Sequence, residues 1–423
     1  PRTTLGGAAE NGKASIASSK KNDNLFDFTL TYSKKISDDH SFTLLLGNSI
    51  QEYINEFSSA GNSGFITDAF LWNNLNGGSG TKTVSSTKNK RNNKAYFGRL
   101  NYSYQDKYML TAIIRRDFDS GNAANYKWAT FPSIALGWDI AGESFMESIE
   151  NQVSQLKIRF GYGQVGNTDV NGNAAAAFYS KPAYLNPDES ILQGVFLSRL
   201  ENPDLKWETT TEKNIGLDFE ILNRKVSGSL EIYNRVVSDL LATKPLNSYN
   251  EINLIATNVG ATESNGIELT LNTTNISSNN FTWRSTFTYS KYKTNWKERA
   301  PDWKPSVYEG YNDPVRAQYS RLSDGIMQIG EIVPAQPDLY PGQIKIKDVN
   351  GFQRDGFGNP MTDENGIFLR TNAPDGIIDD ADTVLLGSSD PKWVAGFSNT
   401  IIYKKFELNF HFNGMFGRKI VNQ

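Results

Sequence analysis

Five oxygen-bearing side chains stand in two short acidic segments of the chain, in the order of a calcium-binding loop. If residues 352–374 are taken out, the segments join to read DVNGDGIIDDAD. EF-hand loops place oxygen ligands at about positions 1, 3, 5, 9 and 12, with a glycine at the sharp turn. That glycine is Gly376, and the spacing predicts a Ca²⁺ site in a surface loop formed by Asp348, Asn350, Asp375, Asp379 and Asp382.

Two features of the same segments favour a different interpretation. Residues 352–374 interrupt the loop, and the last ligand position holds Asp382, which reaches less far than the usual glutamate. The alternative is a network of Asx turns, in which the carboxylates accept backbone N–H groups and bind no ion. The sequence leaves both open.

Aromatic side chains in the predicted long loops are candidates for binding cargo. Aromatic faces stack on pyranose rings and also hold peptide side chains. The alternative is that these side chains pack the loops internally. The candidates for substrate contact are Trp72, Tyr179, Tyr184, Trp303, Tyr308 and Tyr311, with Phe70 and Trp296 as further members of the set.

The sequence gives little support for catalysis or for other kinds of metal site. The chain has no cysteine, and its two histidines, His40 and His411, fall in different predicted hairpins. Thiol catalysis, disulfides and Cys-ligated metals are therefore excluded, and no histidine-based triad or zinc site can be assembled. The charge cluster at residues 115–117 either contacts substrate or is a solvated strand end. We expect the protein not to be an enzyme.

Composition limits the class of protein. The 423 residues are 38% hydrophobic with a mean hydropathy of -0.49, and no apolar run approaches the roughly 20 residues of a membrane-spanning helix. The net charge of -3 gives no argument for a nucleic-acid partner. The aromatic content of 12% would supply the belts of a membrane barrel.

The elements that must carry these residues are strands, because apolar and polar residues alternate with a period of two. From Phe281 to Tyr289, for example, aromatic residues alternate with Thr and Arg. We predict about twelve such strands, over residues 25–36, 41–54, 93–104, 107–117, 131–140, 155–164, 212–222, 225–236, 263–274, 280–291, 392–403 and 405–416.

A barrel and a β-sandwich both produce the alternation, so the alternation alone does not distinguish them. The lengths of the connections do. The predicted turns within pairs are mostly short, whereas 55–92, 118–130, 165–211, 237–262 and 292–391 are long. Short and long connections therefore alternate along the chain. This predicts an all-β fold, an antiparallel transmembrane β-barrel with short periplasmic turns and long extracellular loops.

From about Asn93 onward the chain contains several motifs whose order and spacing are specific. They are RLNYSYQDKYMLTAIIRRD at 99–117, FPSIALGW at 131–138, ESFM at 143–146, LKIRFGYGQVGN at 156–167, NPDLKWETTTEKNIGLDF at 202–219, NVGATESNGIELTL at 258–271, PGQIKIKDVNG at 341–351 and DGIIDDADTVLLGSSDPKWVAGFSNTI at 375–401. In these motifs the sequence resembles the SusC-like (RagA/SusC) TonB-dependent transporters of Gram-negative outer membranes.

The resemblance implies a barrel of about 22 strands with a plugged lumen. It also implies a SusD-like surface lipoprotein as lid, TonB–ExbB–ExbD as the energy source, and oligosaccharides or peptides as imported cargo. We expect residues 1–24 to be a loop leading into the barrel and 25–423 to be part of the barrel domain. On this reading the plug, the TonB contacts and the last barrel strands lie outside the chain. The alternatives are a siderophore or cobalamin receptor, and a soluble all-β carbohydrate-binding or adhesion module.

Overall fold

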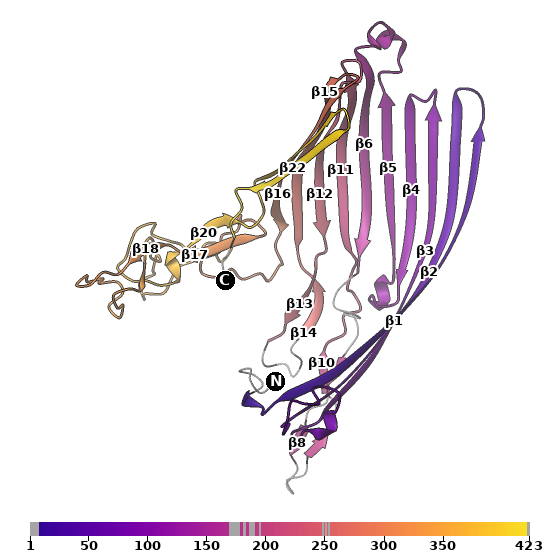
Figure 1. Ribbon diagram of the computed structural model, residues 1–423. Coiled ribbons are helices and arrows are strands. Elements are labelled where there is room, and N and C mark those ends of the chain that lie inside the picture. The colour runs from indigo at the N-terminus through magenta and orange to yellow at the C-terminus, as the bar shows by residue number, and fades with distance from the viewer. Residues whose placement is uncertain are drawn as a thin grey trace.

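The computed structural model describes residues 8–420, except 169–177, 181, 182, 186–190, 194, 195, 248, 250, 251 and 253, and within 178–198 it describes the backbone only. One antiparallel sheet of twelve strands forms most of it, and Figure 1 shows this sheet as a curved wall. In spatial order its strands are β1 (Lys13–Lys35), β2 (His40–Ser63), β3 (Thr83–Tyr104), β4 (Tyr108–Asp119), β5 (Trp128–Asp139), β6 (Val153–Asn167), β11 (Glu208–Ile221), β12 (Val226–Ser238), β15 (Ala261–Ser277), β16 (Phe281–Glu298), β21 (Trp393–Tyr403) and β22 (Phe406–Phe416).

Smaller elements occupy the connections. Their strands pair as β10 with β7, β8 with β9, β13 with β14, β17 with β20 and β18 with β19. No helix among the described residues is long and apolar enough to cross a membrane. The bounds are β7 (Phe178–Ser180), β8 (Ala183–Leu185), β9 (Ile191–Gln193), β10 (Phe196–Arg199), β13 (Leu241–Pro245), β14 (Leu254–Asn258), β17 (Ala317–Arg321), β18 (Ser323–Ile326), β19 (Ile344–Ile346) and β20 (Thr383–Ser388), with 3₁₀ turns η1 (Leu75–Gly77), η2 (Ala124–Tyr126), η3 (Ser144–Ile149) and η4 (Asp380–Asp382).

All twelve strands expected from the alternation are present. Short and long connections alternate as expected except around β5, where the connection before it, 120–127, is shorter than the connection after it, 140–152. The turn between β3 and β4 shows why one end is tight. Gln105 and Asp106 both have positive φ, at 52° and 54°, as the two-residue turns that match strand twist require.

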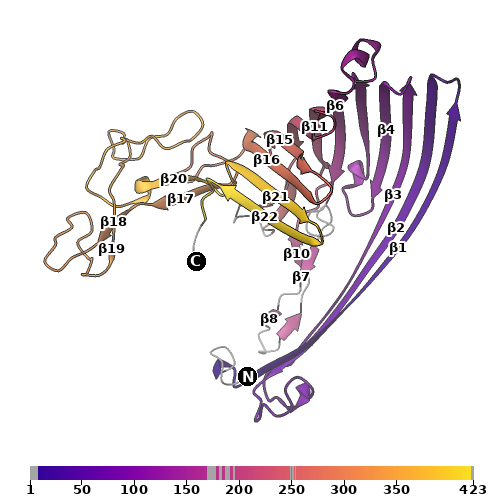
Figure 2. The same ribbon diagram turned by 45° about the horizontal axis from the view of Figure 1, so that its top comes forward.

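The expected loop over residues 1–24 is wrong from Lys13 onward, because β1 begins there and pairs with β2 without interruption. The first half of β1, KASIASSKKNDN, lacks an apolar face and so shows no alternation. Its backbone still pairs with β2, from Lys13 opposite Ser63 onward. Figure 2 shows that β1, β2 and β3 extend together beyond the other strands. Most side chains of this extension are polar, with Ile16, Phe57 and Val84 as exposed exceptions, as is expected of strands that continue beyond the membrane.

The sheet has two unlike faces. On β5 the side chains of Ile134, Leu136 and Trp138 alternate with those of Ser133, Ala135 and Asp139, and register carries the pattern to the neighbouring strands. Large apolar side chains on the first face are open, since Leu136 is 50% and Phe412 65% exposed. A whole sheet face of open apolar side chains, opposite a polar face, is typical of a strand wall that meets lipid. We call this the lipid face and the polar side the lumen face.

Two aromatic belts mark the edges of the lipid face. Tyr104, Tyr108 and Trp138 lie beside one another at the short-turn end, with ring centroids 6.0 and 6.4 Å apart. Tyr96, Phe118 and Trp128 form the other belt, in which Trp128 lies 6.0 Å from Tyr96 and 5.1 Å from Phe118. From Trp128 to Trp138 a strand advances about 33 Å, which a tilt of about 40° reduces to a height of about 25 Å. That is the height of the apolar band of an outer-membrane barrel.

The lipid face predicts how neighbouring positions tolerate charge. Ile134→Arg places a cation near the middle of the band and should lower the free energy of unfolding by about 2–4 kcal/mol. Urea unfolding of the full-length protein in lipid vesicles measures this. Ser133→Arg, one residue away on the lumen face, is the matched control and should change the value by less than about 1 kcal/mol. Equal losses for the two variants would contradict the assignment of faces.

Candidate functional site

Charged side chains on the lumen face are paired across strands. Arg159 on β6 donates from its Nε to the Oδ2 of Asp218 on β11 at 2.7 Å. Arg235 on β12 lies directly opposite Glu212 on β11 and donates to its Oε2, with the nearer nitrogen at 2.6 Å. These two pairs therefore offer hydrogen-bonding groups whose charges are balanced.

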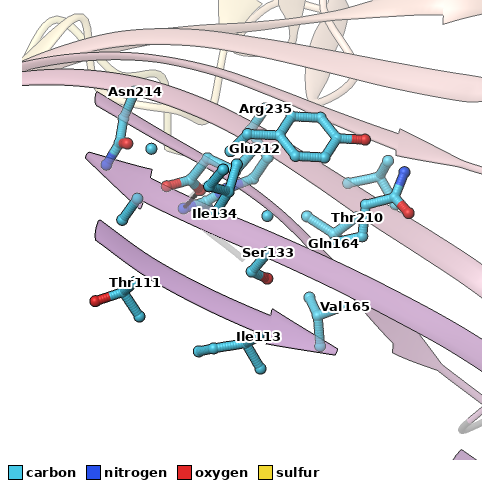
Figure 3. A pocket seen from close by; sticks show the side chains of 15 residues that line it. Thr111, Ile113, Ser133, Ile134, Gln164, Val165, Thr210, Glu212, Asn214 and Arg235 are labelled. Atoms are coloured by element: carbon cyan, nitrogen blue, oxygen red, sulfur yellow. Dashed lines mark hydrogen bonds and ion pairs between the residues drawn. The ribbon is translucent and has the colours of Figure 1, made fainter. Parts of the chain in front are cut away.

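Two adjoining depressions open on this face, with volumes of about 680 and 590 Å³. Ile113, Ser133, Gln164 and Val165 line both, so the depressions are continuous, and we call them together the trough. Figure 3 shows the first depression, where Glu212 and Arg235 lie together beside Thr210 and Gln164.

Glycines keep the floor of the trough low. Gly161 and Gly163 on β6 line the first depression and add no side chain to it. A Cβ at Gly161 would collide with the Oδ1 of Asn214, whereas a Cβ at Gly163 would lie 3.0 Å from the Oγ of Ser133. The contact at Gly163 is tight, but it is with the end of one small side chain, so a shift of Ser133 by a few tenths of an ångström would make room for a substitution there.

A buried carboxylate fixes the outer end of the trough. Asp119, only 2% exposed, accepts hydrogen bonds from Arg91 on β3, from the hydroxyl of Thr168 at 2.5 Å and from the backbone N–H of Gly121 at 2.8 Å. These contacts connect β3, the loop after β4 and the end of β6. Desolvating a carboxylate is costly unless it is fully hydrogen-bonded, and here it is.

The charge cluster at residues 115–117 divides between the two faces. Arg115 lines the trough, bonds Asp117 at 2.9 Å and lies 5.5 Å from the Phe97 ring. Arg116 lies instead over Trp128 on the lipid face, at 5.4 Å. The sequence prediction treated them as one cluster, but their alternate positions on β4 separate them.

The acidic segments come together as the spacing predicts, but their carboxylates bond to the backbone. Asp348 accepts the N–H of Asp375 and Gly376, at 3.2 and 2.7 Å. Asp382 is fully buried and accepts the N–H of Val349, Asn350 and Asp379 at 2.8, 3.2 and 3.0 Å, while Asp379 caps η4.

These contacts have the form of the Asx network. Among the described residues, no group of three or more His, Cys, Asp or Glu side chains is placed to hold a metal ion. The oxygen donors are of the type Ca²⁺ prefers, yet this arrangement uses them internally. The calcium site stays a prediction of the sequence.

The predicted cargo-binding aromatics lie outside the trough. Trp303 lies 6.0 Å from Tyr311, and Arg299 lies over Trp303 at 4.2 Å. Tyr308 lies 5.0 Å from Tyr319. Trp72, in contrast, is 55% exposed at the tip of the loop between β2 and β3, whereas the side chains of Tyr179 and Tyr184 fall outside the described residues. Contact of any of them with cargo stays a prediction.

Tyr319 on β17, beside Tyr308, adds a polar contact to these aromatics. The Tyr319 hydroxyl donates to Asp313 at 2.6 Å. Burial raises the pKa of Tyr319, and the hydrogen bond to Asp313 raises it further. The hydroxyl therefore stays protonated and remains a donor at neutral pH. Figures 1 and 2 show that β17–β20 form an arm that projects from the main sheet.

The trough itself was not anticipated from the sequence. A usable signal was present, because Glu212 and Arg235 stand on predicted neighbouring strands with opposite charges on the same face. Reading it requires the cross-strand register, which depends on where the short turns place each strand.

A curved antiparallel wall with a lipid face, a polar lumen face and loops alternately short and long defines the class of outer-membrane β-barrels. The family described as TonB dependent receptor-like, beta-barrel matches residues 3–346. The chain belongs to the TonB-dependent receptor family and is a protein of the outer membrane.

Individual proteins to which the chain is similar support the same family. The chain is 31% identical over 424 residues to TonB-dependent receptor P3 of Formosa agariphila, covering 100% of this chain and 41% of the relative. It is 29% identical to TonB-dependent receptor SusC of Bacteroides thetaiotaomicron over 75% of this chain and 30% of that protein. The fold is similar to the RagAB peptide importer in its "open-open" state, with a TM-score of 0.76 and 20% identity, over 96% of this chain and 42% of that one. The chain thus spans about two fifths of the F. agariphila relative's length.

The loop contacts of Asp382 predict a local loss of protection. Asp382→Ala leaves three backbone N–H groups without their acceptor, so opening of residues 348–351 and 379–382 should become about 30-fold more frequent. Hydrogen–deuterium exchange of the full-length protein measures this. Asp380→Ala is the control, since Asp380 is 62% exposed in a surface ion pair with Arg321. If a chelator alone loosened the wild-type loop to the same degree, a bound cation rather than Asp382 would hold it.

Proposed function

We propose that the whole protein imports bulky polar nutrients, oligosaccharides or peptides, across the outer membrane. The trough is the single observation that carries the proposal. Its two continuous depressions, of about 680 and 590 Å³, together exceed the usual size of a site for one small ligand. A large cargo fits such a surface better than a compact one.

The chemistry of the trough supports a cargo rich in hydroxyl or amide groups and low in net charge. Its arginines Arg91, Arg115 and Arg235 each face a carboxylate. An anionic cargo would have to compete with those carboxylates, whereas hydroxyls can bond to the free edges of each pair. The RagAB peptide importer, which has a similar fold, fits the peptide part of this class of cargo.

The proposal includes two partners. One is a SusD-like surface lipoprotein that closes the extracellular mouth. The other is TonB–ExbB–ExbD, which would act through the plug region of the whole protein. Members of the family bind and move cargo without breaking bonds, so no catalytic group is required.

Two other functions fit the trough and the lipid face less well. A siderophore or cobalamin receptor shares the family, but a compact chelate would leave much of the trough empty. A soluble carbohydrate-binding module would not leave the lipid face open along the sheet. Extraction separates the barrel from the soluble module, since a barrel needs detergent and shows heat-modifiable gel mobility.

Filling the trough should block cargo. Gly163→Leu adds a side chain to its floor, and binding of the transported oligomer to the purified full-length protein should weaken about tenfold or more. Isothermal titration calorimetry with neutral oligosaccharides and neutral peptides measures this and identifies the preferred class.

The control is Gly98→Leu on β3. It faces lipid, and a Cβ there meets Leu46 at an ordinary 3.5 Å. Both variants should retain heat-modifiable mobility. Normal cargo binding by a folded Gly163→Leu protein would argue that the trough is not part of the cargo path.

A further inference from the structure

Two cations lie on the lipid face at the height of the extracellular aromatic belt. Lys94 on β3 is opposite Phe118 on β4, and Arg116 is opposite Tyr96, so the two cations are diagonal neighbours across one strand pair. Diagonal Cβ atoms lie about 7–8 Å apart, and both side chains are long enough to reach one anion between them. Both residues are exposed.

Neither cation is neutralised within the part of the chain that the structure describes. Lys94 lies 6.0 Å from the Phe118 ring and Arg116 lies 5.4 Å from the Trp128 ring, and these are their charge-related contacts. Farther out on the same face of β3 the lysines do have partners, because Lys88 bonds Glu56 and Lys90 bonds Glu52. On this face of β3, positive charge without a carboxylate partner is therefore found at the level of the belt and not farther out.

The surroundings show what such a pair can bind. Below Arg116 on the same face, Ile114 is 58% exposed and belongs to the apolar band. Tyr96, Phe118 and Trp128 supply a flat aromatic platform beside the cations. A ligand here must have acyl chains that run down the band and an anionic group at its top. Phosphate satisfies the second condition, since Arg and Lys bind it by short charge-assisted hydrogen bonds.

We propose that Lys94 and Arg116, on the platform of Tyr96, Phe118 and Trp128, bind the phosphate of an anionic glycolipid headgroup in the outer leaflet. The site lies on the outside of the barrel wall, whereas the trough opens on the lumen face. Lys94 and Phe118 also border the second depression of the trough, but Tyr96, Arg116 and Trp128 do not. Partial dehydration at the lipid–water boundary strengthens the attraction compared with a fully exposed lysine.

The experiment uses the full-length protein in detergent, titrated with diphosphorylated lipid A or with the same lipid after removal of its phosphates. Bound lipid is counted by native mass spectrometry. Lys94→Gln with Arg116→Gln should weaken binding of the phosphorylated lipid about tenfold. Arg116→Lys, which keeps the charge, should restore most of the affinity when Lys94 is intact.

The matched control is Arg99→Gln, which removes an exposed cation from the lumen face of the same strand. Its lipid binding should stay within about twofold of wild type. Heat-modifiable mobility confirms that each variant is folded. The proposal fails if the double variant binds the phosphorylated lipid normally, or if the dephosphorylated lipid binds equally well. It also fails if millimolar inorganic phosphate displaces the lipid, because the site would then be a general anion site.

Discussion

The structure depends on one constraint: a backbone N–H or C=O in hydrocarbon must be paired, because leaving it unpaired costs several kcal/mol. The sheet meets this by unbroken antiparallel registers from β1 to β22, with irregularities confined to points such as Glu220/Ile221 and Thr274/Ile276. A fixed register sends every second side chain to the same face. The lipid face, the lumen face and the position of every functional side chain follow from that pairing.

The two faces place different chemistry on adjacent residues. On β4, Arg115 pairs with Asp117 in the trough, whereas Arg116 lies over Trp128 toward lipid. A cation in water-filled space is best balanced by a carboxylate, and a cation at the membrane boundary by an aromatic ring and a lipid headgroup. Cargo handling and membrane anchoring can therefore occupy the same short strand without interfering.

Much of the fold could be predicted from the sequence, for a physical reason. Lipid on one side of the wall enforces alternation of apolar and polar residues, so strands such as 131–140 can be recognised from the sequence. Tight turns such as Gln105-Asp106 mark where these strands end. The first half of β1 could not be recognised, since beyond the membrane both its faces meet water. The trough was missed because Gly161, Gly163 and the pair Glu212–Arg235 come from separate strands, and only register brings them together. The acidic segments were predicted to meet, but their spacing could not show that the carboxylates would turn to backbone N–H groups.

The most direct test of this account uses the absence of cysteine, which makes every introduced thiol unique. Single cysteines at residues 130–138 of β5 in the full-length protein would carry a spin label, and collision with oxygen, which concentrates in lipid, would be compared with collision with a water-soluble nickel chelate. We predict that labels at Ile134 and Leu136 meet oxygen, that labels at Ser133 and Ala135 meet the chelate, and that the preference reverses at every residue. Uniform exposure to one reagent, or the opposite phase, would contradict the assignment of a lipid face and a lumen face.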